Sequence, residues 1–389
     1  MVTLDIWPAL PLIIRGDLIS TSSTDRIAAA LGHSSRVCEV DLVTDHGQLE
    51  KVLAAMQVPF PEMTELRLKS LDETPPTIPD SFLGGSAPRQ LRFFRLEGIP
   101  FPGLPKLILS ATHLVYLALS RIPHSGYFSP ETMVTFLSVL SGLDTLSLGF
   151  ESPQSYPHWE SKQPPALKCS VIPSLTYFFF RGVSDYLEDL MTRIDTPKLN
   201  DLRINCFNQI DFDTPQLAQF INRTPTLRAP NEAQVVFDNR TVDLKLTNRT
   251  NESGCATSRI SISCKDPDWQ LSSISQICNF CWPPLSVVAD LYIDHPRDWE
   301  NDAIENTAWL ELLRPFTAVK NLYLTEGCAP GIAAALQEVV GVTGVVSDLQ
   351  NIFVKGLEPQ GPVQKHIGEF VAVRQLSGHP VALSLWNKE

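Results

Sequence analysis

Apolar residues recur along this chain in one six-residue pattern: an apolar position, two variable positions, then two apolar positions that flank one more residue. The pattern occurs as LRFFRL, LVYLAL, LDTLSL, LTYFFF, LNDLRI, VADLYI, VKNLYL and LQNIFV, with partial copies in TELRL and VALSLW. Because apolar and variable positions alternate at its end, each copy predicts a β-strand with one buried face. Many copies follow one another at roughly 30-residue intervals, a period typical of stacked repeats.

Helical patterns lie between these strands. Ser129-Pro130-Glu131 precedes MVTFLSVL and Thr214-Pro215 precedes QLAQFI, so each of these helices is expected to start with an N-cap residue and a proline. Further helices are predicted at GQLEKVLAAM, SDYLEDLMTRI, NDAIENTAWLELL and APGIAAALQEVV. A strand and helix unit cannot cover its own strand, so neighbouring units must stack. We therefore expect one α/β solenoid over residues 1–389, with parallel strands on the concave face and helices on the convex face.

Two segments depart from this alternation. Residues 228–270 are polar and carry strand-like pieces without a helical pattern between them, which predicts an irregular insertion, such as a hairpin, within the array. The opening WPALPLIIRGD predicts a short buried strand over residues 10–14 that ends in a turn at Gly16 and Asp17. Its prolines and early acid do not fit a secretory signal, and no stretch reaches the roughly 18 consecutive apolar residues of a membrane span.

Composition narrows the function classes. With 43% hydrophobic and 19% charged residues among 389, the chain can bury a large core and is expected to be soluble and globular. Its net charge of −12 argues against nucleic acid as the main partner, because phosphates require basic residues. The eight cysteines are too scattered for a disulfide framework. The lone Cys278-x-x-Cys281 lacks a second pair for zinc, so we interpret both thiols as core residues of a helix.

The chain contains no motif for a phosphate-binding loop, a nucleophile elbow or a zinc protease helix, so we assign no catalytic residue, metal or cofactor. Glycosylation sequons occur at Asn222, Asn239, Asn248 and Asn251. Taken alone they favour a secreted glycoprotein, but without a secretory signal we expect them to remain unmodified.

Several segments carry a resemblance to known proteins: WPALPLII, RVCEVDL, PEMTELRL, LPKLILSATHLVYLALSRIPHSGYFSPE and FTAVKNLYL. They resemble the leucine-rich-repeat family, and more narrowly the fungal, mushroom-type F-box and leucine-rich-repeat proteins. The resemblance spans nearly the whole chain and implies the substrate-recognition region of a ubiquitin-ligase receptor. Two departures stand out. The position three residues after the last strand leucine holds neither the asparagine nor the cysteine usual in the family, and no Leu-Pro-x-Glu signature indicates an F-box module, so we expect the repeat region alone.

One position of the repeat, between its last two apolar residues, should point to the concave face and form a ladder across neighbouring strands. This ladder is basic toward one end and aromatic toward the other. Arginine and tyrosine are enriched at binding hot spots. Our candidate protein-binding residues are Arg67, Arg95, Phe179, Arg203, Tyr292, Tyr323 and Phe353. The alternative is that the aromatic residues only shield the sheet or pack on the inserted segment.

The sequence thus predicts a non-enzymatic protein-interaction module in the cytoplasm or nucleus. Its partner would be a protein ligand, its link to a ubiquitin ligase would be indirect, and neither nucleic acid nor a membrane is expected as a partner. One alternative is a secreted glycoprotein with an incorrectly assigned start, which attached sugar would reveal. The other is an enzyme on a solenoid scaffold, which no motif supports and which would need a polar pocket of converging titratable groups.

Overall fold

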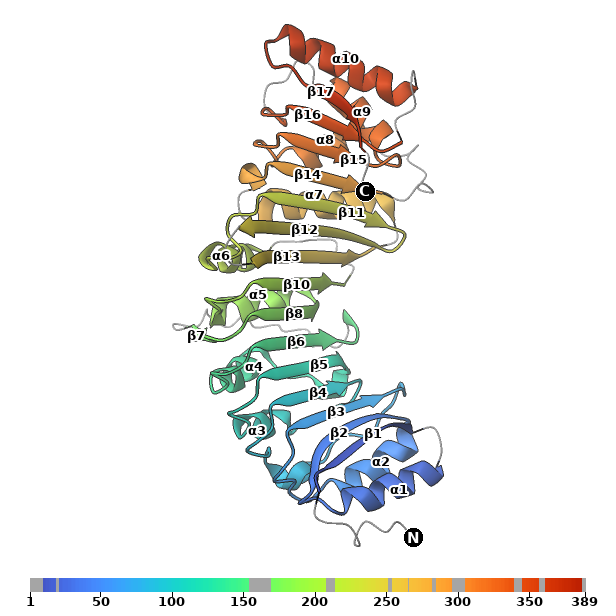
Figure 1. Ribbon diagram of the computed structural model, residues 1–389, viewed down its shortest axis with the longest axis vertical. Helices are drawn as coiled ribbons and strands as arrows, with labels where there is room; N and C mark the ends of the chain where they lie inside the picture. Colours follow the sequence, from blue (N-terminus) through green and yellow to red (C-terminus); the bar gives the residue numbers. More distant parts are fainter. Residues whose placement is uncertain are drawn as a thin grey trace. The chain divides into compact units, whose positions relative to one another are not determined.

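The computed structural model describes residues 10–18, 21–153, 169–207, 214–250, 254–264, 266–281, 285–295, 305–338, 345–356 and 361–386 (Figure 1). The chain divides into two compact units, Met1–Leu199 and Asn200–Glu389, here called unit 1 and unit 2. Fifteen strands lie in mostly parallel sheet, seven in unit 1 and eight in unit 2, and helices connect many of them. The predicted mixed α/β class with parallel strands is therefore confirmed.

Unit 1 alternates strands with helices. Its elements are β1 (Leu12–Leu18), α1 (Thr21–Leu31), β2 (Val37–Thr44), α2 (His46–Ala55), β3 (Glu65–Ser70), η2 (Phe82–Gly85), β4 (Phe93–Glu97), α3 (Leu104–Leu109), β5 (Tyr116–Ile122), η3 (His124–Gly126), α4 (Pro130–Leu137), β6 (Thr145–Phe150), β7 (Ser170–Val171), β8 (Tyr177–Gly182), α5 (Ser184–Arg193) and β9 (Ile194–Asp195). The sheet order is β1-β2-β3-β4-β5-β6-β8, with every described pairing parallel, while β7 and β9 form a separate pair.

Unit 2 contains the remaining elements. They are β10 (Asp201–Cys206), α6 (Pro215–Arg223), β11 (Glu232–Asp238), β12 (Thr241–Thr250), β13 (Gly254–Ser263), α7 (Pro267–Gln276), η5 (Ile277–Cys281), η6 (Leu285–Val287), β14 (Asp290–Asp294), α8 (Asn306–Leu313), β15 (Asn321–Leu324), α9 (Ala329–Glu338), β16 (Asn351–Val354), α10 (Pro362–Leu376) and β17 (Ala382–Leu385). Its sheet order is β10-β13-β12-β11-β14-β15-β16-β17.

The six-residue pattern gives the strands their two faces. In β3, β4, β14, β15 and β16 the exposure alternates residue by residue, with the pattern's apolar positions buried. Leu66, Phe94, Leu291, Leu322 and Ile352, for example, are fully buried. Neighbouring helices pack on one another, α3 on α4 and α4 on α5 in unit 1, α7 on α8 and α8 on α9 in unit 2. These helices lie behind the strands in Figure 1. The opposite side of each sheet is called its open face below.

The segment 228–270 holds β11, β12 and β13, which follow one another without a helix between them. Strand β12 runs antiparallel to both β11 and β13, whereas β11 pairs parallel with β14 and β13 pairs parallel with β10. All three strands are therefore full members of the sheet of unit 2. They share the open face of that sheet, and their pairings place residues side by side on consecutive strands from β10 to β14.

Two local predictions need correction. Strand β1 does not end at Gly16 and Asp17 but runs through both to Leu18, because it pairs with β2 along its whole length. Leu10 and Ile13 are exposed, and only Ile14 of the expected buried strand is buried.

At α4, Ser129 accepts the expected capping hydrogen bond from the Thr132 amide.

Helix α6 differs from α4 at its start. Thr214 occupies the expected position before Pro215, but its side chain caps nothing and is buried. The physical reason is its backbone, whose ψ of 58° lies outside the extended region that a capping residue adopts.

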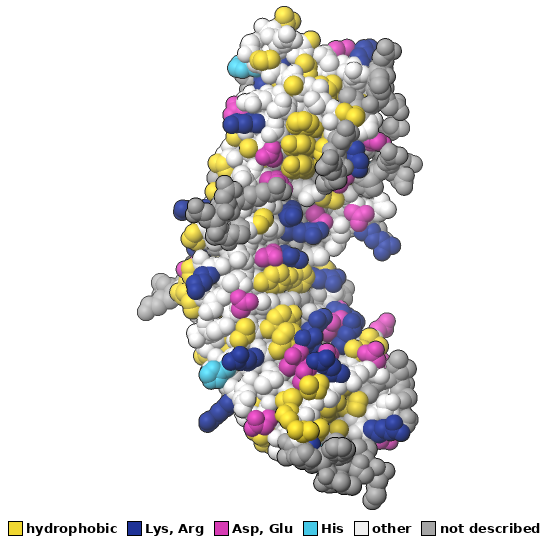
Figure 2. Space-filling model, in the orientation of Figure 1, with side chains coloured by type: hydrophobic (Ala, Val, Ile, Leu, Met, Phe, Trp, Pro, Cys, Tyr) yellow, Lys and Arg dark blue, Asp and Glu magenta, His cyan; other side chains and the backbone are white. Residues whose placement is uncertain are grey.

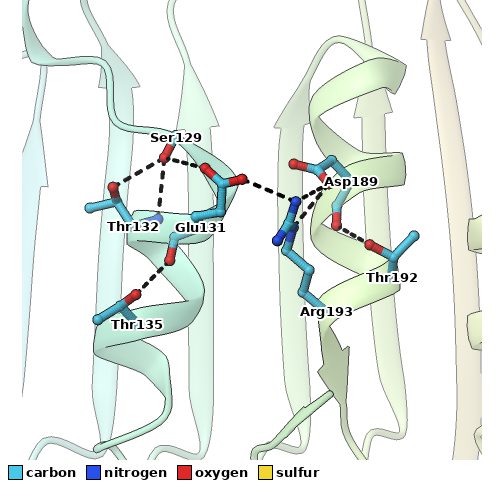
Figure 3. A network of polar contacts seen from close by, with 7 residues as sticks. All are labelled: Ser129, Glu131, Thr132, Thr135, Asp189, Thr192 and Arg193. Atoms are coloured by element: carbon cyan, nitrogen blue, oxygen red, sulfur yellow. Dashed lines mark hydrogen bonds and ion pairs between the residues drawn. The ribbon is translucent and has the colours of Figure 1, made fainter. Parts of the chain in front are cut away.

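A buried arginine connects two consecutive helices of unit 1 (Figure 3). The Arg193 side chain, 9% exposed, donates from Nε to Asp189 Oδ1 at 2.9 Å on its own helix α5. Its Nη2 donates to Glu131 Oε1 at 3.1 Å in the first turn of α4, where the other Glu131 oxygen accepts from Ser129. One guanidinium thus joins the C-terminal end of α5 to the N-terminal end of α4.

Candidate functional site on the open face

The open face of unit 2 places side chains from successive strands in straight columns. Tyr292 is in register with Tyr323, Tyr323 with Phe353, and Phe353 with Ser384. Two residues earlier on each strand, Asp290 is in register with Asn321 and Asn321 with Asn351. In β14, β15 and β16 both columns are half-buried and alternate with fully buried residues, which places them on the open face.

The first column is a stack of aromatic rings, here called the aromatic ladder and defined as Tyr292, Tyr323 and Phe353. The ring centroids are 4.2 Å apart between the tyrosines and 4.7 Å apart between Tyr323 and Phe353, with interplanar angles of 7° and 10°. These distances match the roughly 4.8 Å between hydrogen-bonded strands, so the sheet itself sets the stacking distance. Figure 2 shows a pile of apolar side chains over β14, β15 and β16 on this face.

Trp386, which directly follows β17, completes this surface. Its amide donates to the Val354 carbonyl at 2.9 Å, and its ring lies 6.0 Å from that of Tyr292 and 5.6 Å from that of Tyr323, tilted by 53° and 59°. The last strand thus directs an indole over the two phenols. The resulting surface has apolar rings with polar edges, a composition suited to contacts with proteins.

The second column is a chain of polar side chains. Asn321 Nδ2 donates to Asp290 Oδ1 at 2.7 Å, and Asn351 Nδ2 donates to Asn321 Oδ1 at 2.8 Å. Each amide side chain is therefore held in one orientation by its neighbour. This polar column runs beside the aromatic ladder, and its first member, on β14, is a carboxylate.

Burial is the main reason why both phenols of the ladder resist ionisation. It raises the pKa of Tyr292 and of Tyr323 above the ordinary value, and the carboxylates of Glu232 and Asp290 raise both further. The two hydroxyl groups therefore remain protonated over the physiological pH range. They can act as hydrogen-bond donors or acceptors to a ligand.

The basic candidates of unit 1 also share one column, since Arg67 is in register with Arg95 and the column continues through Ala118 and Ser147 to Phe179. Both arginines are already in ion pairs. Arg67 Nε lies 2.5 Å from Glu65 Oε1, and Arg95 Nη2 lies 2.9 Å from Glu97 Oε2. Lys69 also reaches Glu97, at 2.9 Å. The open face of β3 and β4 therefore carries paired charges of both signs.

Arg203 in unit 2 is engaged in the same way. Its guanidinium binds Asp201 on the same strand through Nε and Nη2, at 3.1 and 2.9 Å. Its register neighbour on β13 is Arg259, which pairs with Asp243 at 2.6 Å, and the next position, on β12, is Lys245. The column thus runs from basic residues on β10, β13 and β12 through Gln234 to the aromatic ladder.

Three parts of this surface were missed by sequence reasoning. Arg259, Lys245 and Gln234 belong to the segment expected as an insertion, and only the strand order places them in the column. Asn321 and Asn351 occupy the same position in two copies of the pattern, directly before its second apolar residue. This recurrence is visible in NLYL and NIFV. Trp386 ends VALSLW, but its position over the phenols depends on the path of the chain after β17.

The other sequence candidates are distributed through the fold. Cys278 is buried, as expected, while the Cys281 side chain lies outside the described residues. Asn222 and Asn239 are exposed, Asn248 is half-buried, and Asn251 lies outside the described part of the chain. Within the residues that the structure describes, no group of histidine, cysteine and acidic side chains could hold a metal ion, and no helix is long and apolar enough to cross a membrane.

Comparison with known proteins adds no identity. No family model matches the sequence, and a search of curated proteins finds no match.

Proposed function

We propose that the chain is a protein-interaction module that binds a protein ligand on the open face of its sheet. The observation that carries this proposal is the aromatic ladder, three half-exposed rings stacked in register on consecutive strands. We further propose that the strand and helix units form a leucine-rich-repeat-like solenoid. The recurrence of the six-residue pattern at β14, β15 and β16 supports this interpretation.

The ladder is suited to binding because it is rigid before any ligand arrives. Each ring contacts its neighbour in the ladder, and stacked aromatic pairs are stabilised by about 0.5–1.5 kcal/mol beyond their burial. A ligand therefore orders few side chains on this surface, which lowers the entropic cost of association. Tyrosine is among the residues most enriched at binding hot spots.

The cellular role follows from the resemblance to F-box and leucine-rich-repeat proteins. We propose that the module acts in the cytoplasm or nucleus and selects proteins as the recognition region of such receptors does. Its connection to a ubiquitin ligase would pass through another protein. The sequence resemblance alone supports this role.

A peptide-display selection on the folded full-length chain tests the binding proposal. Selected peptides should lose most of their affinity for a Tyr323→Ala, Phe353→Ala double variant. They should keep it for Trp269→Ala, which removes an exposed aromatic side chain from α7 in the same unit. Peptides that bind all three proteins equally, or a selection that yields none, would contradict the role of the ladder.

A further inference from the structure

Unit 1 contains an aromatic stack that ends in a guanidinium. The rings of Phe93 and Tyr116 lie 3.9 Å apart at an angle of 7°, and the Cζ of Arg67 lies 4.3 Å from the centroid of Phe93. A carboxylate holds the arginine in place, since Arg67 Nε is 2.5 Å from Glu65 Oε1, on the same strand. The chain thus shows, in its own structure, how an open sheet face completes an aromatic stack with a cation.

The aromatic ladder of unit 2 has the same parts without the cation. Tyr323 covers one face of the Tyr292 ring, while the register partner on the other side is Gln234 of β11. Among the described side chains, no cation lies over Tyr292. The end of this stack is therefore an aromatic face bordered by an uncharged amide side chain.

The residue two positions before Tyr292 on β14 carries a carboxylate. Asp290 is on the same strand and the same face as Tyr292, and it accepts a hydrogen bond only from the neutral Asn321 amide among the described partners. No basic residue of the described part of the chain forms an ion pair with it. Its register partner on β11 is Glu232, a second carboxylate. Figure 2 shows acidic side chains along the flank of the apolar pile.

We propose that the Tyr292 ring, on its face toward Gln234, binds an arginine side chain of the protein ligand, with Asp290 as its ion-pair partner. The ligand segment would be extended, so that alternate side chains point to the sheet. This inference rests on the proposed function, because it names the chemistry of the partner that the open face receives. The net charge of −12 adds a long-range attraction for a basic segment.

Arginine fits this position better than lysine for two physical reasons. Its planar guanidinium stacks flat on a ring, as Arg67 does on Phe93, and its fork of donors can bond a carboxylate while it is stacked. A lysine ammonium is a compact and strongly hydrated charge, which loses more hydration on an aromatic face. The structure therefore favours arginine over a general positive charge.

Fluorescence anisotropy with the full-length chain provides the test. The probe is a short fluorescein-labelled peptide of alternating serine and arginine, compared with peptides in which citrulline or lysine replaces every arginine. Citrulline keeps the planar shape and removes the charge. We expect the arginine peptide to bind at least about fivefold more tightly than the citrulline peptide, from one cation–π contact and one partly exposed ion pair. Equal binding of the arginine and citrulline peptides, or of the arginine and lysine peptides, would overturn the proposal.

Variants locate the contact. Asp290→Asn keeps the hydrogen bond to Asn321. It should weaken the affinity for the arginine peptide about threefold and leave the affinity for the citrulline peptide unchanged. Gln234→Arg supplies a guanidinium from the neighbouring strand and should block the peptide as an internal competitor. Trp269→Ala is the control that should bind normally. An unchanged affinity in Asp290→Asn and Gln234→Arg would place the arginine elsewhere and refute the assignment.

The two proposals can fail separately. If display-selected peptides depend on Tyr323 and Phe353 but the arginine peptide does not bind, the ladder is a binding surface and only the arginine assignment is wrong. If neither kind of peptide binds, the proposed function fails as well. Binding of the arginine peptide to the wild-type chain with loss in Asp290→Asn would support both.

Discussion

Replacing Arg193 by methionine should loosen the two helices that it joins. Methionine retains the apolar stem that packs at this position and removes the guanidinium, so the comparison isolates the charged contacts. Arg193 makes two hydrogen bonds to carboxylates, one across to α4 and one within α5. Each hydrogen bond to a charged group contributes about 1.5–3 kcal/mol in a buried setting.

The structure places the expected loss at the lower end of this range. Asp189 and Glu131 are each 36% exposed, so water solvates both carboxylates once the arginine is gone. The intrahelical pair at positions i and i+4 contributes only about 0.3–0.5 kcal/mol by itself. We therefore expect a total loss of about 2 kcal/mol, most of it from the contact to Glu131. For a unit of this size this corresponds to a decrease in Tm of about 4–8 °C.

The assay should resolve local opening, because a chain with two compact units can unfold in more than one step. Hydrogen exchange followed by mass spectrometry should show faster exchange in the peptides that cover α4 and α5, in addition to the lower Tm. Arg314→Met is the matched control, since Arg314 and Glu311 form an exposed pair in unit 2 and should contribute less than about 0.5 kcal/mol. If Arg193→Met lowers stability no more than this control, the contact to Glu131 does not join the helices and the reasoning is wrong.

Two further predictions concern other parts of the fold. Gly84 and Gly85 both have positive φ, 73° and 78°, but a Cβ at Gly84 would lie 2.8 to 3.1 Å from the ring and nitrogen of Pro59, whereas at Gly85 the nearest atom is 3.5 Å away. Gly84→Ala should therefore destabilise the chain by at least about 1 kcal/mol more than Gly85→Ala in thermal denaturation, and equal losses would show that Pro59 yields freely. Because burial raises the pKa of Tyr292 and Tyr323, the folded chain keeps these protons to a higher pH than the unfolded chain, so their contribution to stability is constant below about pH 10 and declines above it. Replacing both tyrosines by phenylalanine should make Tm fall less steeply above pH 10. In a pH titration followed at 295 nm, the absorbance change that occurs at the highest pH should disappear. A decline of Tm identical to that of the wild type would contradict the raised pKa values.

Local alternation predicted the register of the aromatic ladder correctly. Tyr292, Tyr323 and Phe353 occupy the same position in three copies of one pattern, and equivalent positions on parallel strands fall side by side when the copies stack. The ion pairs of Arg67 and Arg95 could not be predicted in the same way, because the choice among several nearby carboxylates depends on side-chain conformation. The arginines that looked like free anchors in the sequence are already bound within the chain.

Nonlocal pairing explains the remaining differences. The Gly16-Asp17 dipeptide favours a turn locally, but the continuous ladder with β2 holds it extended. The strands of residues 228–270 could be recognised one by one, whereas their order in the sheet is set by partners distant in sequence. Trp386 reaches its position because β17 pairs with β16, which directs the indole toward the phenols.

The antiparallel strand β12 also constrains how unit 2 assembles during synthesis. In an array of consecutive repeats, each new strand pairs with the one made just before it. Here the neighbour of β10 is β13, so β10 must wait for the chain to extend through β11 and β12 before its edge is paired. During that interval it exposes unpaired backbone groups, the feature that promotes pairing with other chains. The meander that extends the open face thus delays the pairing of β10, and a nascent chain that stalls before β13 keeps this edge unpaired.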